Sequence, residues 1–305
     1  MCFYMHVLKA KMSIATRTRV GFLVMLALAA ALPAKATESS SHFAKLDDGQ
    51  KIPYTVAGRD EPTLVFIHGW ACDQTVWNAQ VADLSNDMRC VTIDLPGHGQ
   101  SDKPPIDYTM HLYARAIDAV LRDAGVKLAV LVGHSNGTPG IRQFYREYPA
   151  SVRALVIVDG ALRAMADAAT IHKFLEPFHG SDYPKMAGKF VDDLTGTIKD
   201  NALRERIKTT ILKTLQSVSV SELESTTDPA IWKADKIEVP VLMILARQPA
   251  WTPEYEKFVR DLVPKLDYQT WDGVSHFIMM EKPKEFNDAV RGFLRTNHFL
   301  DATGN

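Results

Sequence analysis

The sequence predicts an α/β fold, an open and mostly parallel β-sheet with helices on its faces. Short apolar runs alternate with amphipathic stretches along most of the 305-residue chain. Such runs are typical of strands buried on both faces of a parallel sheet, and right-handed strand–helix–strand crossovers build this architecture. The composition also excludes two classes. With 46% apolar residues and 35 Lys plus Arg against 36 Asp plus Glu, the chain is neither disordered nor basic enough for nucleic acid.

Residues 1–36 match a secretory signal peptide. The apolar run 20–32 follows a basic flank and precedes a small-x-small cleavage motif that ends at Ala36. A transmembrane helix needs roughly 20 apolar residues. We therefore expect cleavage after Ala36, export to the periplasm or the medium, and no stable membrane anchor. Met12 is a more typical start for such a signal than Met1.

The mature chain begins with a predicted edge hairpin. Strands 43–46 and 52–56 flank the turn residues Asp47-Asp48-Gly49. Parallel strands and helices then alternate. The apolar runs that predict the parallel strands are 63–69, 90–97, 128–135, 153–160, 239–246 and 268–273, and the predicted helices are 74–84, 110–124, 141–148, 253–262 and 283–294.

The strand pattern lapses between residues 161 and 234. Apolar residues there recur at helical spacing, as in Leu203, Ile207 and Ile211. This stretch is too long for a plain loop, so we predict a helical cap. The insertion follows a strand and can cover the carboxyl ends of the strands, where open α/β sheets bind ligands. The predicted organisation is a core of residues 37–160 and 235–305 and a cap of residues 161–234.

A G-x-S-x-G motif occupies residues 133–137, between a predicted strand and a predicted helix. In that context the motif predicts a nucleophile elbow, a sharp turn that projects Ser135 above the sheet. The amino end of the following helix favours negative charge beside the hydroxyl. A serine that only caps the helix is the alternative.

With this elbow, the sequence resembles the α/β-hydrolase fold superfamily. Three further segments carry the resemblance: His68-Gly69-Trp70, residues 94–101 (DLPGHGQS) and residues 273–277 (GVSHF). The resemblance covers almost all of the mature chain and is specific for the fold, but it does not identify the substrate. It implies an α/β-hydrolase fold with the helical cap inserted after the sixth strand.

The resemblance also implies a catalytic base and an oxyanion hole. A serine hydroxyl needs a base within hydrogen-bond reach. His276 is preferred because it follows the last strand, at the same edge of the sheet as Ser135, whereas His134 is expected to point away from the site. The backbone N–H groups of Trp70 and Asn136 are implied to stabilise the oxyanion.

The catalytic acid departs from the commoner family pattern. Most members carry it after the strand that matches 239–246, but this chain has no carboxylate there until Glu254. A minority, including some haloalkane dehalogenases and lactone hydrolases, carries the acid one strand earlier, where this chain has Asp159. Asp159 is therefore the predicted acid. A helix cap or loop anchor is its alternative role, and Glu254 and Asp272 are its rivals.

These residues predict a serine hydrolase that cleaves a carboxylic ester or lactone through an acyl-enzyme on Ser135. Serine at the elbow disfavours dehalogenation and epoxide opening, because those relatives use a carboxylate. Carbon–carbon bond hydrolysis, perhydrolysis and ligand binding without turnover remain as alternatives. Aromatic residues of the insertion and of two loops are candidates for an apolar substrate pocket, although they could equally pack the helices onto the sheet: Phe178, Tyr183, Trp251 and Phe277.

We expect a small apolar or weakly charged substrate, no cofactor and no metal. No grouping of histidines and carboxylates has metal-ligand spacing. Cys72 and Cys90 are expected to be free thiols, because about a strand's length separates them and a disulfide requires α-carbons within ~7 Å.

Overall fold

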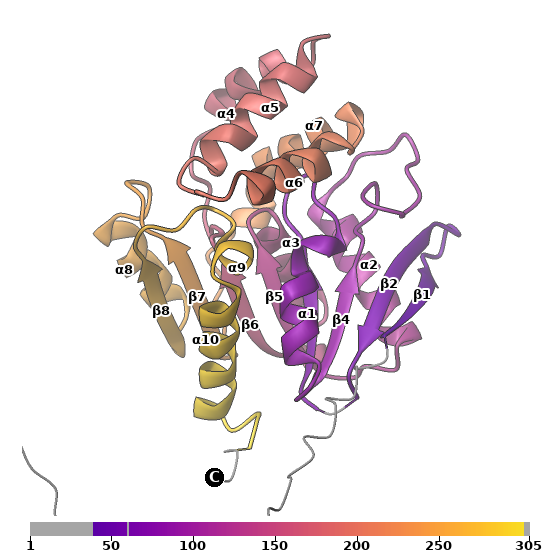
Figure 1. Cartoon of the computed structure of the whole chain (residues 1–305), viewed down its shortest axis with the longest axis vertical. Helices are drawn as coiled ribbons and strands as arrows, with labels where there is room; N and C mark the ends of the chain where they lie inside the picture. Colours follow the sequence, from indigo (N-terminus) through magenta and orange to yellow (C-terminus); the bar gives the residue numbers. More distant parts are fainter. Residues whose placement is uncertain (1–38, 60, 302–305) are drawn as a thin grey trace, which may run out of the picture. The chain divides into compact units, whose positions relative to one another are not determined.

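The computed structural model describes residues 39–59 and 61–301 (Figure 1). The predicted signal peptide, residues 1–36, lies outside the described residues. Among the helices that are described, none is long and apolar enough to cross a membrane.

An eight-stranded sheet forms the centre of the described chain, in the order β1-β2-β4-β3-β5-β6-β7-β8. The first two strands form an antiparallel hairpin whose second strand also pairs antiparallel with β4, and all other neighbours are parallel. The predicted fold class is therefore confirmed. The strands are β1 (Ser39–Lys45), β2 (Lys51–Ala57), β3 (Thr63–Ile67), β4 (Arg89–Ile93), β5 (Ala129–His134), β6 (Val152–Val158), β7 (Val241–Ala246) and β8 (Leu266–Trp271).

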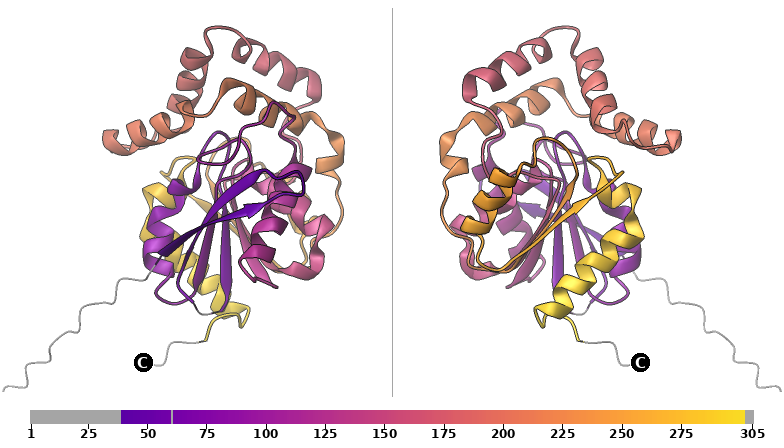
Figure 2. Two further views of the ribbon diagram at one scale, coloured as in Figure 1. Left: turned by 90° about the vertical axis from the view of Figure 1, so that its right-hand side faces the viewer. Right: turned by 90° about the vertical axis from the view of Figure 1, so that its left-hand side faces the viewer.

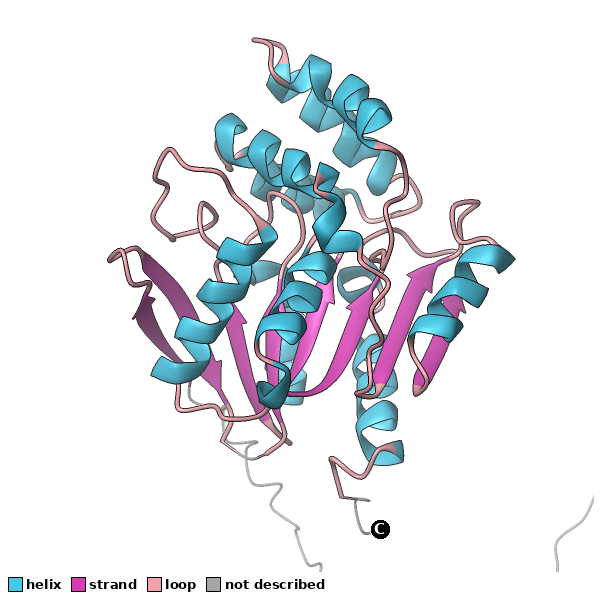
Figure 3. Cartoon of the chain, turned by 180° about the vertical axis from the view of Figure 1, so that it is seen from behind, coloured by secondary structure: helices cyan, strands magenta, loops and turns pink. Residues whose placement is uncertain are grey.

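Helices cover both faces of the sheet (Figure 3). One face carries α2 (Met110–Asp123), α3 (Gly137–Glu147) and α8 (Pro253–Leu262), and the other carries α1 (Asn78–Leu84), α9 (Ile278–Glu281) and α10 (Pro283–Thr296). The strand period of two divides the apolar side chains between these layers. In β3, for example, Val65 and Ile67 face the first layer, whereas Leu64 and Phe66 face the second.

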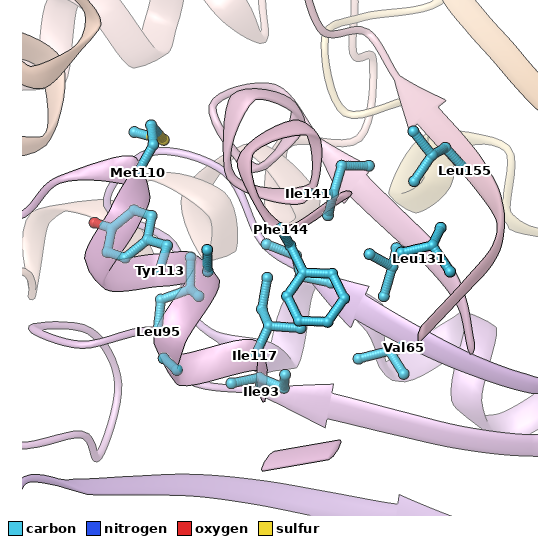
Figure 4. Close-up of a cluster of buried hydrophobic side chains, with 14 of the residues drawn as sticks. Val65, Ile93, Leu95, Met110, Tyr113, Ile117, Leu131, Ile141, Phe144 and Leu155 are labelled. Atoms are coloured by element: carbon cyan, nitrogen blue, oxygen red, sulfur yellow. The ribbon is translucent and has the colours of Figure 1, made fainter. Parts of the chain in front are cut away.

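The first of these layers has a continuous apolar core (Figure 4). Tyr113 and Ile117 of α2 and Phe144 of α3 pack against strand residues such as Val65 and Leu131. All five are fully buried. The core therefore holds the strand ends, and the loops that follow them, in fixed relative positions.

Polar side chains cap the amino ends of several helices. Thr109 Oγ1 accepts a hydrogen bond of 3.2 Å from the backbone N–H of Leu112, and Thr252 Oγ1 accepts one of 3.2 Å from that of Tyr255. Pro253 occupies the first helical position of α8, where its missing N–H costs nothing. These caps place the starts of α2 and α8 where the sequence predicts them.

A helical insertion lies between β6 and β7, and we refer to residues 161–234 as the cap. It contains α4 (Ala168–Leu175), α5 (Tyr183–Leu194), α6 (Asn201–Leu212), α7 (Gln216–Glu224) and the short turns η3 (Glu176–Phe178), η4 (Ser225–Thr227) and η5 (Pro229–Trp232). Figure 2 shows these helices over one end of the sheet. The predicted helical insertion after the sixth strand is confirmed.

Candidate active site

Ser135 lies on a sharp turn between β5 and α3. Its φ of 51° is in the left-handed region, which non-glycine residues occupy rarely and often at functional sites. The turn is held on both sides, because Ser135 N donates to Val158 O at 2.9 Å and Ser135 O accepts from Thr138 N at 2.9 Å. A β-carbon at Gly137 would lie 2.6 Å from the carbonyl oxygen of His68. Glycine is therefore required where α3 passes the loop after β3.

Asp159 and His276 are in direct contact, although 117 residues separate them in the sequence. Asp159 follows β6 directly, and His276 lies in the loop between β8 and α9. His276 Nδ1 donates to Asp159 Oδ2 at 2.6 Å. The Asp159 side chain is 1% exposed and that of His276 is 15% exposed. The carboxylate therefore fixes the tautomer in which Nδ1 carries the proton and Nε2 can act as a base.

The second oxygen of Asp159 is also bound. Oδ1 accepts hydrogen bonds from the backbone N–H of Ala246 at 2.9 Å and from Trp251 Nε1 at 3.3 Å. Both donors belong to the end of β7 or the loop that follows it. The position where most family members carry the acid thus supplies donors to a carboxylate that comes from the neighbouring strand.

The two rival acids lie elsewhere. Glu254 is exposed in the first turn of α8. The Asp272 side chain is 74% exposed and pairs with Arg247. Within the described residues, neither forms a hydrogen bond with His276. Asp159 alone of the three candidates contacts the histidine.

Ser135, His276 and Asp159 all line one pocket of about 530 Å³. The cap and the strand ends supply its walls, which are mostly apolar. Besides the three candidate catalytic residues, its lining includes Trp70, Cys72, Asn136, Met165, Phe190, Leu194, Ile211, Leu223, Trp232, Trp251 and Phe277.

Two predicted pocket residues lie outside this lining. Trp251 and Phe277 line the pocket, but Phe178 and Tyr183 do not. Phe178 is 2% exposed and packs among the rings of neighbouring aromatic residues, with Tyr183 against it. Phe190 and Leu194, nearer the carboxyl end of α5, line the pocket instead. Helical periodicity does not separate them from Tyr183, because residues seven and eleven positions apart lie on nearly the same side of a helix.

The predicted oxyanion donors also border the pocket. Trp70 follows β3 and Asn136 follows the serine, and both line the cavity. Neither backbone N–H donates a hydrogen bond to another of the described residues. Two such groups beside Ser135 are available for an oxygen that acquires negative charge.

Two buried histidines support the site without belonging to its catalytic set. His134 Nε2 donates to the carbonyl oxygen of His276 at 2.9 Å, and the two rings lie 4.8 Å apart between centroids. The prediction that His134 points away from the site is therefore wrong. His68 Nδ1 donates to Gly69 O, and its Nε2 accepts from Leu95 N. Burial, and then the nearby His98, lower the pKa of His68 to about 4, so it stays neutral.

The described residues contain no group of three or more His, Cys, Asp or Glu side chains that could hold a metal ion. The arrangement places a serine hydroxyl, a carboxylate-bound imidazole and two backbone N–H groups at one mostly apolar pocket.

The family described as alpha/beta hydrolase fold matches residues 62–224, more than half of the chain. The chain belongs to the α/β-hydrolase fold family. This confirms the family that the sequence motifs indicate. The match spans the serine turn, the loop after β3 and most of the cap.

Individual relatives of this α/β hydrolase are distant. An sn-1-specific diacylglycerol lipase of Mus musculus is 25% identical over 76% of this chain and 81% of its own. The crystal structure of an esterase from Rhodococcus has a TM-score of 0.73 at 25% identity and covers 84% of this chain and 99% of its own. An enol-lactonase from Burkholderia xenovorans has a TM-score of 0.75 at 19% identity, with 83% and 100% covered, and this likeness shows the fold alone.

Proposed function

We propose that this α/β hydrolase cleaves carboxylic esters or lactones of small apolar or weakly charged molecules through an acyl-enzyme on Ser135. One observation carries the proposal. The Asp159–His276 hydrogen bond of 2.6 Å lies in the lining of the same pocket as Ser135. A bound carboxylate, an oriented imidazole and a serine on a strained turn are the parts that serine-based acyl transfer needs.

The reaction follows from the roles of these groups. His276 Nε2 takes the proton of Ser135 as the hydroxyl oxygen attacks the carbonyl carbon, and Asp159 stabilises the resulting imidazolium. The N–H groups of Trp70 and Asn136 bind the oxyanion of the tetrahedral intermediate. His276 then protonates the leaving alkoxide, and the acyl group stays on Ser135. In the second half, His276 activates a water molecule that releases the acid.

The pocket walls support an uncharged substrate. Phe190, Leu223, Trp232 and Trp251 offer aromatic and aliphatic surface near the serine, and such walls favour apolar acyl or alcohol groups. The Rhodococcus esterase and the murine lipase are both named for the hydrolysis of ester bonds, which agrees with this proposal. An ester or a lactone is therefore the preferred substrate class.

We also propose export. The signal-like residues 1–36 would be removed after Ala36, and the hydrolase would act in the periplasm or the medium. Mass spectrometry of protein purified from the native compartment should find Thr37 as the first residue. An intact amino terminus on cytoplasmic protein would contradict this part of the proposal.

Hydrolysis of p-nitrophenyl esters of increasing acyl length, together with a simple lactone, tests the activity. Wild-type protein should turn over at least one of these substrates, and Ser135→Ala should abolish turnover. Ser151→Ala, at the other end of the sheet before β6, serves as the control and should match wild type. Turnover only of a dienoic diketone acid, or only of peroxide with an acid, would instead assign carbon–carbon hydrolysis or perhydrolysis to the same triad. Retained ester turnover in Ser135→Ala would refute the mechanism.

A further inference from the structure

The cap contains a fully buried carboxylate that the triad does not use. Glu222, in α7, is 0% exposed. Its Oε1 accepts a hydrogen bond of 2.8 Å from Asn136 Nδ2, and its Oε2 accepts one of 3.3 Å from the backbone N–H of Ala71. Oε2 also lies 3.1 Å from His98 Nε2. One cap side chain therefore contacts the serine turn, the loop after β3 and the loop after β4.

Other cap groups hold the loop after β3. Trp70 Nε1 donates to the carbonyl oxygen of Ser219 at 2.8 Å, and Thr214 Oγ1 donates to that of Ala71 at 2.8 Å. The φ of Ala71 is 53°. A non-glycine residue persists in this region only where its surroundings hold it. With Glu222 on the N–H of Ala71 and Thr214 on its carbonyl, the cap fixes both sides of this residue, next to the N–H of Trp70.

His98 balances the charge of this carboxylate. His98 Nδ1 faces the carbonyl oxygen of Pro96 at 3.0 Å, which can only accept, so Nδ1 carries a proton. Burial raises the pKa of Glu222, but the charge of His98 and the hydrogen bonds from His98 and Asn136 outweigh it and hold the pKa below its ordinary value. His98 Nε2 and Glu222 Oε2 lie 3.1 Å apart, so their hydrogen bond requires one further proton, held by one of these two atoms. The pair is neutral overall, so it does not oppose the negative charge that develops in the pocket.

We propose that Glu222 is a positioning residue through which the cap sets the geometry of the oxyanion hole. Glu222 contacts both segments that carry the implied donors: it binds the side chain of Asn136 and the backbone N–H of Ala71, the residue after Trp70. The packing of α7 on the core thus fixes the positions of the oxyanion donors. The cap therefore contributes to kcat as well as to the walls of the pocket. This inference rests on the proposed function of Ser135.

Glu222→Gln isolates the contact with the loop. The amide oxygen can still accept from Asn136 Nδ2, and the amide nitrogen can donate to a neutral His98. That nitrogen cannot accept the N–H of Ala71. Glu222→Ala removes all three contacts. The matched control is Ser221→Ala on the same helix, because Ser221 Oγ accepts from the backbone N–H of Tyr108 at 2.9 Å, outside the catalytic pocket.

Steady-state ester hydrolysis gives the first measurement. We expect Glu222→Gln to lower kcat about 10²-fold, the size of effect that a misplacement of about 1 Å can produce, with KM little changed. The inhibition constant of a trifluoromethyl ketone, which forms a tetrahedral oxyanion on the serine, should rise by the same factor by which kcat/KM falls. Ser221→Ala should leave both values near wild type. A folded Glu222→Gln protein with wild-type kcat and wild-type ketone inhibition would overturn the proposal.

Hydrogen exchange of the intact protein provides a measurement that needs no activity. Backbone amides of residues 69–72 should exchange faster in Glu222→Gln than in wild type or Ser221→Ala, because the loop has lost one of its cap contacts. Unchanged exchange in this loop overturns the coupling, whatever the activity. An inactive wild-type protein with the expected change in exchange would instead refute the proposed function and leave the coupling standing. Glu222→Ala need not fold for either test, since Glu222→Gln and its control decide both.

Discussion

Replacing Asp159 with asparagine exchanges one carboxylate oxygen of the candidate triad for an NH₂ group. The hydrogen bonds around Asp159 determine the orientation of the new amide. Asp159 Oδ1 accepts from two donors, Ala246 N and Trp251 Nε1, so an asparagine keeps its oxygen on that side. Its NH₂ group then faces His276 Nδ1, the atom that donates to Asp159 Oδ2 at 2.6 Å. Two donors cannot share this contact, so the imidazole must take the other tautomer.

The wrong tautomer removes the base. With the proton on Nε2, His276 cannot accept the proton of Ser135, and no carboxylate stabilises the imidazolium. A loss of about 10⁴-fold in kcat is typical of this change in a serine triad, which corresponds to about 5 kcal/mol of transition-state stabilisation. Stability should change far less, because the amide keeps the hydrogen bonds from Ala246 and Trp251.

Turnover of a p-nitrophenyl ester by Asp159→Asn measures this directly, with Glu254→Gln and Asp272→Asn as matched controls. Glu254 and Asp272 are exposed and do not contact His276, so both controls should keep near-normal kcat. The assignment of the acid is refuted if Asp159→Asn retains kcat within about tenfold of wild type while either control collapses.

Three further outcomes follow from the same structure. Gly137→Ala should lower the free energy of unfolding by about 1–3 kcal/mol, because the new β-carbon meets the His68 carbonyl at 2.6 Å; urea unfolding checks this, and an unchanged midpoint contradicts it. Burial lowers the pKa of His68 to about 4, from about 6.5 in the unfolded chain. The contribution of neutral His68 to the free energy of unfolding is therefore complete above pH ~6.5, and it falls by about 3 kcal/mol as the pH drops towards 4. His68→Gln should therefore lose stability less steeply over that range, and an equally steep loss contradicts this. Burial raises the pKa of the Cys72 and Cys90 thiols, so iodoacetamide should label neither in folded protein at neutral pH; rapid labelling of either would show an error.

The placement of Ser135, Asp159 and His276 at one pocket could be predicted because it depends on short motifs at strand ends. Parallel strands bring their carboxyl ends to one edge of the sheet. Ser135, Asp159 and His276 each follow a different strand of that sheet. Reading which strand each residue follows is therefore enough to bring Asp159 to His276, even across 117 residues.

The cap could not be predicted to the same depth. Its helices are recognisable from apolar spacing, but the side that faces the pocket depends on how each helix docks on the core. Phe178 and Phe190 are both aromatic cap residues, and only docking makes one of them core and the other pocket wall. The segment around Glu222 shows no amphipathic pattern, and its partners His98 and Asn136 are 124 and 86 residues away. Only tertiary structure can reveal such contacts.

The error at His134 has a similar origin. The residue immediately precedes the nucleophile, and strand alternation predicts that it points to the opposite side from Ser135. That side is also where the loop carrying His276 packs, through its carbonyl oxygen and the ring of Phe277. Strand alternation alone therefore predicts a side chain remote from the site, whereas the packing of the His276 loop, which makes His134 part of the pocket lining, depends on the whole fold.

Covalent labelling with a fluorophosphonate tests the central claim, that Ser135 is an activated nucleophile, most directly. Peptide mass spectrometry of folded protein should find one adduct, on the peptide that contains Ser135. Labelling should be absent in Ser135→Ala and strongly slowed in Asp159→Asn, because the imidazole can no longer accept the serine proton. A folded wild-type protein that remains unlabelled, or that carries the adduct on another residue, would contradict the account.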